Sequence, residues 1–376
     1  MIYKGSVLIF LIFIIALHLS TKETRMRNQY IWPGRKSWLL CPAIVLFCLT
    51  GFQKKAQAQE TQIRGFVHFD AALRDDKVNF TLGEQDLFIT SQLSDRISFL
   101  GETVFKYSAS SPTKFDISIE RIVMKYNYYR NHNVLFGKHH TPVNFWNDTY
   151  HHGRVFFPTI FRPMMFDQGI IPLHTTGIRL QGQNLGDMRF GYDILVGNGV
   201  ASDDLTDNNS SKSFMAGFSF RPADKLKLGA SYYYDEIPKG ATLHHTSLKS
   251  RKNVTQQLIS GSLSYFDNNF EYLIESTMSI NKNDSTGSPI SYASYGYFGY
   301  RYKKFVPYIK GEYLDMNAKE VYFSNHPQIN YLVGLRYEVN YLTVLKLEYA
   351  HTETHASGSA PKVKYNSVNF QFAIGF

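Results

Sequence analysis

The chain has almost no cysteine, and it lacks apolar runs long enough to cross a membrane as helices. Its two cysteines, Cys41 and Cys48, both lie within residues 1–58. The remainder could therefore cross an oxidising compartment without forming disulfides. The two main apolar runs, 6–19 and 37–52, are each shorter than the ~20 residues that a spanning helix needs. These absences argue against a disulfide-stapled secreted domain and against a helical membrane bundle.

An excess of charge of one sign is also missing from most of the chain. The formal net charge is +9, but residues 1–58 hold eight of the 40 basic residues and one of the 31 acidic residues. The rest is left with 32 basic and 30 acidic residues, which is close to neutral. A near-neutral chain gives little support to nucleic-acid binding, so we expect no nucleic-acid partner.

The N-terminal segment has the pattern of a secretory signal. The basic pair Arg35–Lys36 precedes the second apolar run, which leads to the small-x-small sequence Ala56–Gln57–Ala58. We expect residues 1–58 to be a signal-peptide region, cleaved before Gln59, and Met26 is a second candidate start. Residues 59–376 would then form a single domain.

Aromatic residues are abundant, and they recur with a period of two. Tyr and Phe number 26 and 29, and aromatic residues make up 15% of the chain. In 329–340 and in 368–376 apolar and polar side chains alternate, as they do on a strand that has one apolar and one polar face. A soluble sandwich could use the same alternation with its apolar face inward. The length, the aromatic content and the recurrence of the pattern up to Phe376 favour a transmembrane barrel.

Sixteen strands are predicted, and short turns alternate with long polar connections between them. This pattern, with an even number of strands, is typical of bacterial outer-membrane barrels. We therefore predict an all-β, antiparallel transmembrane β-barrel that is integral to a bacterial outer membrane and surrounded by its lipid. The predicted strands are 62–72, 84–94, 95–108, 114–127, 132–139, 173–183, 187–198, 212–222, 225–235, 254–266, 269–281, 290–302, 305–316, 327–340, 341–354 and 363–376.

Charged side chains concentrate on one parity of these strands. Because a charge facing lipid costs about 2–4 kcal/mol at the midplane, this parity should face a wet lumen. Arg121 breaks the rule, since it shares the parity of Ile117 and Ile119, and a bulge or a register error would explain it. The pore-lining candidates are Arg64, Glu102, Lys106, Arg179, Arg189, Lys310, Glu312, Arg336 and Glu338.

The connection 140–172 is long and rich in proline and in large apolar residues. Exposed outside the barrel, so many apolar side chains would promote aggregation, so we expect the segment to fold into the lumen and narrow it. Four of its charged residues are then candidates for the field across the narrowest point. These constriction candidates are Asp148, Arg154, Arg162 and Asp167.

Histidines in the same connection suggest a metal site, which we weigh against simple hydrogen bonding. His140, His151 and His152 could bind zinc or copper together with a carboxylate. Adjacent histidines on an extended chain point apart, however, so the prediction is no metal site and no cofactor. The triplet His355–Ala356–Ser357 has residue types used by hydrolases but no evident orienting partner, and we expect no enzymatic activity.

The signal segment, the sixteen alternating strands, the terminal strand 368–376 and the long connection together resemble the outer-membrane porins of Gram-negative bacteria. The closest resemblance within them is a loose one to the porin O/P-like (phosphate/polyphosphate) group. Those proteins are associated with arginine- and lysine-lined pores, whereas the lumen predicted here mixes acids and bases. The resemblance also implies recognition of Phe376 by the barrel-assembly machinery and a homotrimer.

Two functions follow as hypotheses. The first is a passive diffusion channel for small hydrophilic solutes or ions, constricted by 140–172. The second is a non-conducting barrel whose extracellular loops bind a ligand or a metal.

Overall fold

The structure, a computed structural model, describes residues 60–108, 111–150, 153–199, 207, 209–242, 249–323, 326–356 and 361–376. The predicted signal region and Met26 lie outside these residues. The strands are β1 (Glu60–Arg74), β2 (Lys77–Ser94), β3 (Ile97–Tyr107), β4 (Phe115–Tyr129), β5 (His132–His140), β6 (His174–Leu185), β7 (Phe190–Gly197), β8 (Ser213–Ala223), β9 (Leu226–Ile237), β10 (Val254–Phe266), β11 (Phe270–Lys282), β12 (Ile290–Tyr300), β13 (Phe305–Asp315), β14 (Gln328–Asn340), β15 (Thr343–Thr354) and β16 (Val363–Gly375).

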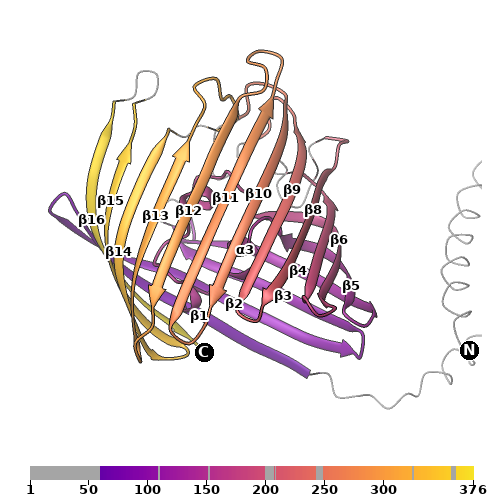
Figure 1. The fold of residues 1–376 in the computed structure, drawn as a ribbon, viewed down its shortest axis with the longest axis horizontal. Coiled ribbons are helices and arrows are strands. Elements are labelled where there is room, and N and C mark those ends of the chain that lie inside the picture. Colours follow the sequence, from indigo (N-terminus) through magenta and orange to yellow (C-terminus); the bar gives the residue numbers. More distant parts are fainter. Residues whose placement is uncertain are drawn as a thin grey trace, which may run out of the picture. The chain divides into compact units, whose positions relative to one another are not determined.

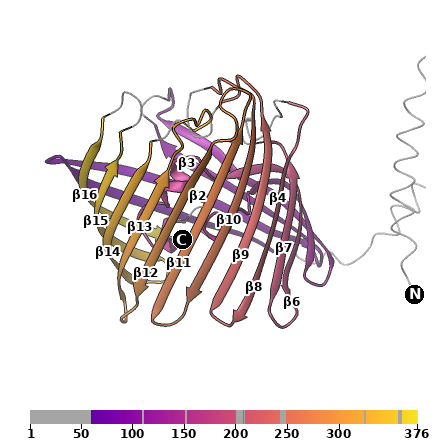
Figure 2. The same cartoon turned by 45° about the horizontal axis from the view of Figure 1, so that its top comes forward.

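Each strand pairs with its neighbours in sequence, and β1 pairs with β16, so the sheet closes into a 16-stranded antiparallel barrel (Figures 1 and 2). This confirms the predicted fold class, and most strand ends fall within three residues of their predicted positions. Figure 1 shows the C-terminus at the end of the barrel that carries the short turns, here called the turn end. No helix among the described residues is long and apolar enough to span a membrane.

The two faces of the wall differ in the way that the alternation predicts. Residues paired across adjacent strands point to the same face, and the row Ser262, Glu275, Tyr295, Glu312 and Asn330 runs along the inner one. The side chains between them are apolar and face outward. Four examples with their exposed fractions are Ile274 (52%), Ile309 (55%), Tyr331 (59%) and Val333 (56%). The apolar surface is therefore on the outside of the barrel.

A β-bulge in β4 explains Arg121. Glu102 pairs with Arg121, but the next residue of β3, Thr103, pairs with Ile119, so Glu120 is the extra residue. One extra residue reverses the parity of everything beyond it. Arg121 therefore points to the same side as Glu102 and forms an ion pair with it, while Ile119 faces outward.

The first hairpin differs from the prediction, which placed a long connection over 74–83. β2 begins at Lys77, and only two residues, Asp75 and Asp76, separate it from β1. Both adopt positive φ, 48° and 59°. This conformation suits tight hairpin turns, and aspartate tolerates it. The polar side chains at this turn were misinterpreted as a loop.

The last residue completes the closure of the barrel. Gly65 and Phe376 exchange two backbone hydrogen bonds of 2.9 Å each. The Phe376 ring lies over the backbone of Gly65, where a Cβ atom would stand 2.3 Å from the ring. A side chain at position 65 would therefore displace the Phe376 ring from this position.

Candidate pore constriction

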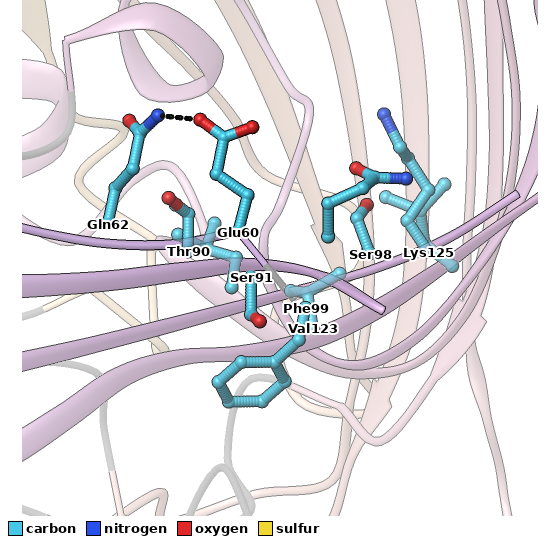
Figure 3. A pocket seen from close by; sticks show the side chains of 11 residues that line it. Glu60, Gln62, Thr90, Ser91, Ser98, Phe99, Val123 and Lys125 are labelled. Carbon is cyan, nitrogen blue, oxygen red and sulfur yellow. Dashed lines mark hydrogen bonds between the residues drawn. The ribbon is translucent and has the colours of Figure 1, made fainter. Parts of the chain in front are cut away.

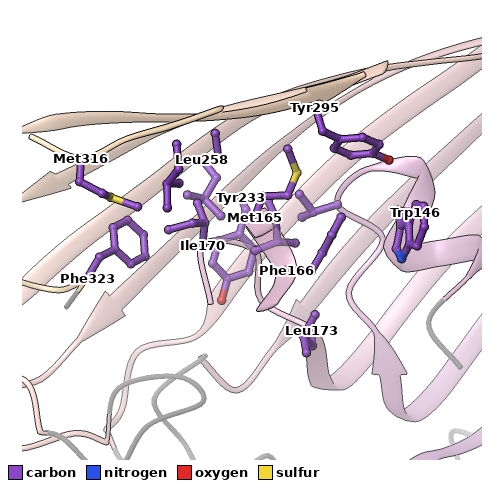
Figure 4. Packing of buried hydrophobic residues seen from close by; sticks show 14 of the residues in the cluster. Trp146, Met165, Phe166, Ile170, Leu173, Tyr233, Leu258, Tyr295, Met316 and Phe323 are labelled. Carbon is purple, nitrogen blue, oxygen red and sulfur yellow. The ribbon is translucent and has the colours of Figure 1, made fainter. Parts of the chain in front are cut away.

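The segment that joins β5 to β6 folds into the barrel. It contains the short helices α3 (Phe145–Thr149) and α4 (Met164–Asp167) and the 3-10 turn η1 (Arg154–Phe156). Figure 4 shows its side chains packed among residues of the barrel wall. Trp146, Phe157, Ile160 and Phe166 are each 0–1% exposed. The inward fold inferred from the apolar content is thus what the structure shows, and we call this segment, residues 141–173, the lumen loop.

The apolar core lies between the lumen loop and one part of the wall. Its wall residues come from β7 to β15 and include Leu195, Tyr233, Leu258, Tyr295 and Leu332. The loop therefore buries its apolar side against these strands. Not all of its large residues are covered, because Phe156 and Phe161 keep 49% and 44% of their surface exposed.

Three wall glutamates accept hydrogen bonds from backbone N–H groups of the lumen loop. A loop inside a barrel has few regular backbone partners, and an ionised carboxylate is a strong acceptor for such donors. The three carboxylates come from three different strands, so they hold the loop at separate points. The pairs are Glu275 with Phe145 and Trp146 (3.2 Å to the latter), Glu312 with Met164 (2.7 Å) and Glu348 with Ile160 (2.7 Å).

Two wall cations bind the carbonyl groups of the same loop. Lys346 Nζ donates to the carbonyl oxygens of Arg154 (2.6 Å) and Thr159 (3.1 Å), and Arg336 Nη1 donates to that of Pro158 (3.1 Å). Lys346 is 1% exposed. Acidic wall residues thus accept hydrogen bonds from loop amides, and basic wall residues donate hydrogen bonds to loop carbonyls. Together these bonds fix the position of the lumen loop inside the barrel.

The two ends of the loop are tied to each other by one side chain. Asn147 Nδ2 donates to the carbonyl oxygens of Thr141 (2.8 Å) and Leu173 (3.0 Å). Asn147 is 1% exposed, so these bonds are shielded from water. The loop therefore returns to the wall next to the point where it left.

The constriction candidate Asp148 lies on α3 and faces β6. Its Oδ1 is 3.1 Å from Arg179 Nη2, and Arg179 also binds Asp193 at 2.7 Å. Burial alone would raise the pKa of Asp148, but the attraction of Arg179, together with that of Lys227 and Arg121, outweighs it and lowers the pKa. The carboxylate therefore stays ionised and is shared in a three-residue cluster.

The other three candidates lie further along the loop than Asp148. Arg154 Nη2 is 3.8 Å from Glu84 Oε2 on β2, and its guanidinium lies 4.8 Å from the centre of the Phe157 ring. Arg162 and Asp167 interact electrostatically, and burial lowers the pKa of Arg162. The structure thus groups Arg154, Arg162 and Asp167 and places Asp148 in the separate cluster with Arg179.

Most pore-lining candidates form ion pairs instead of a row of open charges. Lys310 pairs with Glu312 (3.2 Å), Arg336 binds Glu338 (3.0 Å), and Glu102 pairs with Arg121. Arg179 is in the cluster with Asp148. Lys106 is 3.6 Å from Glu84 with 64% of its side chain exposed, and Arg64 is exposed and donates to Gln62.

Arg189 does not lie on a strand. It precedes β7 in the turn after β6, with a φ of 47°, and pairs with Asp224 of the turn before β9 at 3.1 Å. This is a correction to its predicted place on the wall, and the reason is that β7 begins at Phe190.

The roles of Glu275, Lys346 and Glu348 as loop anchors were missed by sequence reasoning. They share the parity of the other charged strand residues, which indicates the lumen side, and the sequence carries no further signal of this role. Nothing in a period of two reveals which wall residue meets a segment about 130 to 190 residues away in the chain.

The metal hypothesis finds no support in the described part of the barrel, where no group of three or more His, Cys, Asp or Glu could hold an ion. His140 Nε2 is 3.6 Å from Glu102, and His174 Nε2 is 2.8 Å from Glu120, so these histidines face carboxylates in pairs. His151 and His152 lie outside the described residues.

The lumen retains hollows at its turn end. One, of about 360 Å³, is lined by β1 to β5, and Figure 3 shows Glu60, Gln62, Thr90 and Lys125 around it. Another, of about 320 Å³, lies between the underside of the lumen loop and the ends of β14 and β15.

Comparison with known proteins identifies the fold. No family profile and no curated protein matches the sequence. Among solved structures, the anion-selective porin from Comamonas acidovorans aligns with a TM-score of 0.63 at 11% identity, over 85% of this chain and 100% of that one. OmpTdeltaL8, a loop deletion mutant of an outer membrane protein of Vibrio cholerae, gives 0.60 at 13%, over 85% and 100%. Salmonella typhi OmpF gives 0.57 at 10%, over 84% and 97%.

These likenesses show that the chain has a porin-type barrel fold. At such low sequence identity these likenesses are evidence for the fold only. The finer resemblance to the porin O/P-like group stays a prediction.

Proposed function

We propose that this protein is an integral protein of a bacterial outer membrane and forms a passive diffusion channel for small hydrophilic solutes or ions, narrowed by the lumen loop. The observation that carries the proposal is the combination of an apolar outer face with a polar interior that a long loop enters and to which it is fixed. Sixteen-stranded barrels are wide enough to leave a water-filled passage. A loop held by ionisable wall residues on separate strands sets the size of that passage.

The charges around the loop also support a channel. Arg154, Arg162 and Asp167 group on the loop, and Glu84 lies on the wall near Arg154. Charges of both signs placed at a narrow point act on any ion that passes, so they would tune charge preference. The mixture of acids and bases favours weak selectivity over a strict anion or cation filter.

Reconstitution into a planar lipid bilayer tests the proposal. The purified, folded protein should produce stepwise current increases of uniform size as single barrels insert. Barrel folding is checked independently by the shift in gel mobility on heating in SDS. Folded protein that inserts without any current would overturn the channel function and leave a non-conducting, ligand-binding barrel as the better interpretation.

The same proposal includes assembly. We propose that Phe376 serves as the recognition residue for the barrel-assembly machinery and that the barrels associate as trimers. The exposed ring of Phe376, at 60%, supports the first of these, since the side chain is accessible at the turn end. Cross-linking in native membranes followed by gel electrophoresis would give a trimer band, and a monomer alone would contradict the second.

A further inference from the structure

The hollow under the lumen loop has the composition of a binding site, and we propose that it holds a neutral, cyclic, polyhydroxylated solute such as a saccharide on its way through the barrel. This inference rests on the proposed channel function and specifies the solute class. The volume of the hollow, about 320 Å³, is at the lower end of the range of ligand pockets, which fits one or two sugar rings.

The polar side of this pocket is a closed set of ion pairs. Glu271 Oε1 accepts from Arg336 (2.6 Å) and from Arg301 (2.9 Å), and both arginines also bind Glu338. Two arginines and two glutamates carry no net charge. A charged solute would have to displace a partner from an existing pair, so the set favours a neutral solute over an ion.

These groups can still bind hydroxyl groups. Arg301 and Glu338 keep 30% and 26% of their side chains exposed. A guanidinium has five N–H donors and a carboxylate about four acceptor positions, and the pairs within the set use only part of them. A solute that offers donors and acceptors side by side, as adjacent sugar hydroxyls do, can bind both without breaking the pairs.

Four of the other residues that line the pocket are aromatic, beside Val155, Pro158, Asn340 and Val344. Tyr150 and Phe156 come from the loop, and Phe266 and Tyr341 come from the barrel. Phe156 is 49% exposed and Tyr341 is 82% exposed, so their rings are available to a solute. The C–H face of a pyranose ring packs on an aromatic ring, whereas its hydroxyl edge needs polar partners. The pocket provides both in one place.

The test measures block of the ion current by sugars in planar bilayers containing the full-length protein. The probes are D-glucose and maltose, with sorbitol as a polyol that has no ring. The sugars should reduce the current with a saturating dependence on concentration, and sorbitol should produce only the small decrease due to viscosity. Phe156→Ala should raise the half-blocking concentration at least fivefold.

Phe161→Ala is the matched control, because Phe161 is a loop phenylalanine with similar exposure that does not line the pocket. It should leave the block unchanged. Tyr341 lies in a turn, so Tyr341→Ala is a second variant with little risk to folding. It should also weaken the block. An equal response to glucose and sorbitol, or a saturable block by glutamate or phosphate in place of sugars, would overturn the saccharide proposal. Absence of any current would refute the channel itself, so the two failures are distinct.

Discussion

Replacing Lys346 by methionine should free the middle of the lumen loop without unfolding the barrel. Methionine keeps most of the aliphatic volume and removes the ammonium group that donates to the carbonyls of Arg154 and Thr159. Hydrogen bonds of charged groups contribute about 1.5–3 kcal/mol each, so the loss of two should lower the free energy of local opening by roughly 3 kcal/mol. Because about 1.4 kcal/mol is a factor of ten, opening should become about 100-fold more frequent.

Hydrogen exchange detects this opening directly. The amide of Ile160 donates to Glu348 at 2.7 Å, and the residue is fully buried. Its exchange therefore requires the loop to leave the wall. Mass spectrometry on peptides covering 153–162 should show exchange roughly 100 times faster in Lys346→Met than in the parent. Peptides from β9 to β11 should exchange at their original rate.

Lys125→Met is the matched control. Lys125 is also a lysine on the inner side of the wall, but it is exposed and lines the hollow bounded by β1 to β5, which no residue of the lumen loop lines. It should leave exchange in the loop unchanged. If Lys346→Met leaves the exchange of 153–162 within twofold of the parent, the wall cations do not hold the loop, and the anchoring argument is wrong.

Three further outcomes follow from the geometry. Deleting 145–165 should raise single-channel conductance, because it removes most of the lumen loop; an unchanged conductance would show that the loop does not constrict. Deleting Glu120 should leave a barrel that still folds and whose gel mobility still shifts on heating, because the deletion restores regular alternation. Deleting Leu347 from the regular part of β15 should abolish folding, because it turns a buried charge toward lipid. The lowered pKa of Asp148 means that the stability of its pair with Arg179 is present above the ordinary aspartate pKa and is lost only as the pH falls through the lowered value. The contribution of Asp148 to protection near α3, taken as the ratio of the protection factors of the parent and of Asp148→Asn at each pH, should therefore stay constant from pH 7 to about 4, the ordinary aspartate value, and fall below it.

Alternation was enough to place nearly every strand and to assign its two faces. The prediction for β10, 254–266, coincides with the observed strand, and the pore-lining candidates Glu312 and Arg336 lie on the lumen side, where they bind the lumen loop. The pattern is reliable because a single charge on the lipid face is costly. Each strand must therefore alternate apolar and polar residues independently of the others. It failed only where the chain departs from a regular strand, as at the Asp75–Asp76 turn and at Arg189.

The roles of the constriction candidates were harder to predict, because they depend on contacts across the lumen. Their presence on one inward loop followed from the many apolar residues of that segment. That Asp148 would bind Arg179, while Arg154 would approach Glu84, could not be read from their order in the chain. These partners come from strands distant in sequence and meet only when the barrel has closed.

The amino-acid sequence by itself determined the barrel, its inside and outside and the inward path of the long connection, because period, parity and apolar content are local properties of the chain. Only the tertiary structure decided which wall residues hold the loop and which charges remain open to a solute. A closed sheet brings together side chains from strands far apart in sequence, and no local pattern records which of them will face each other across its interior.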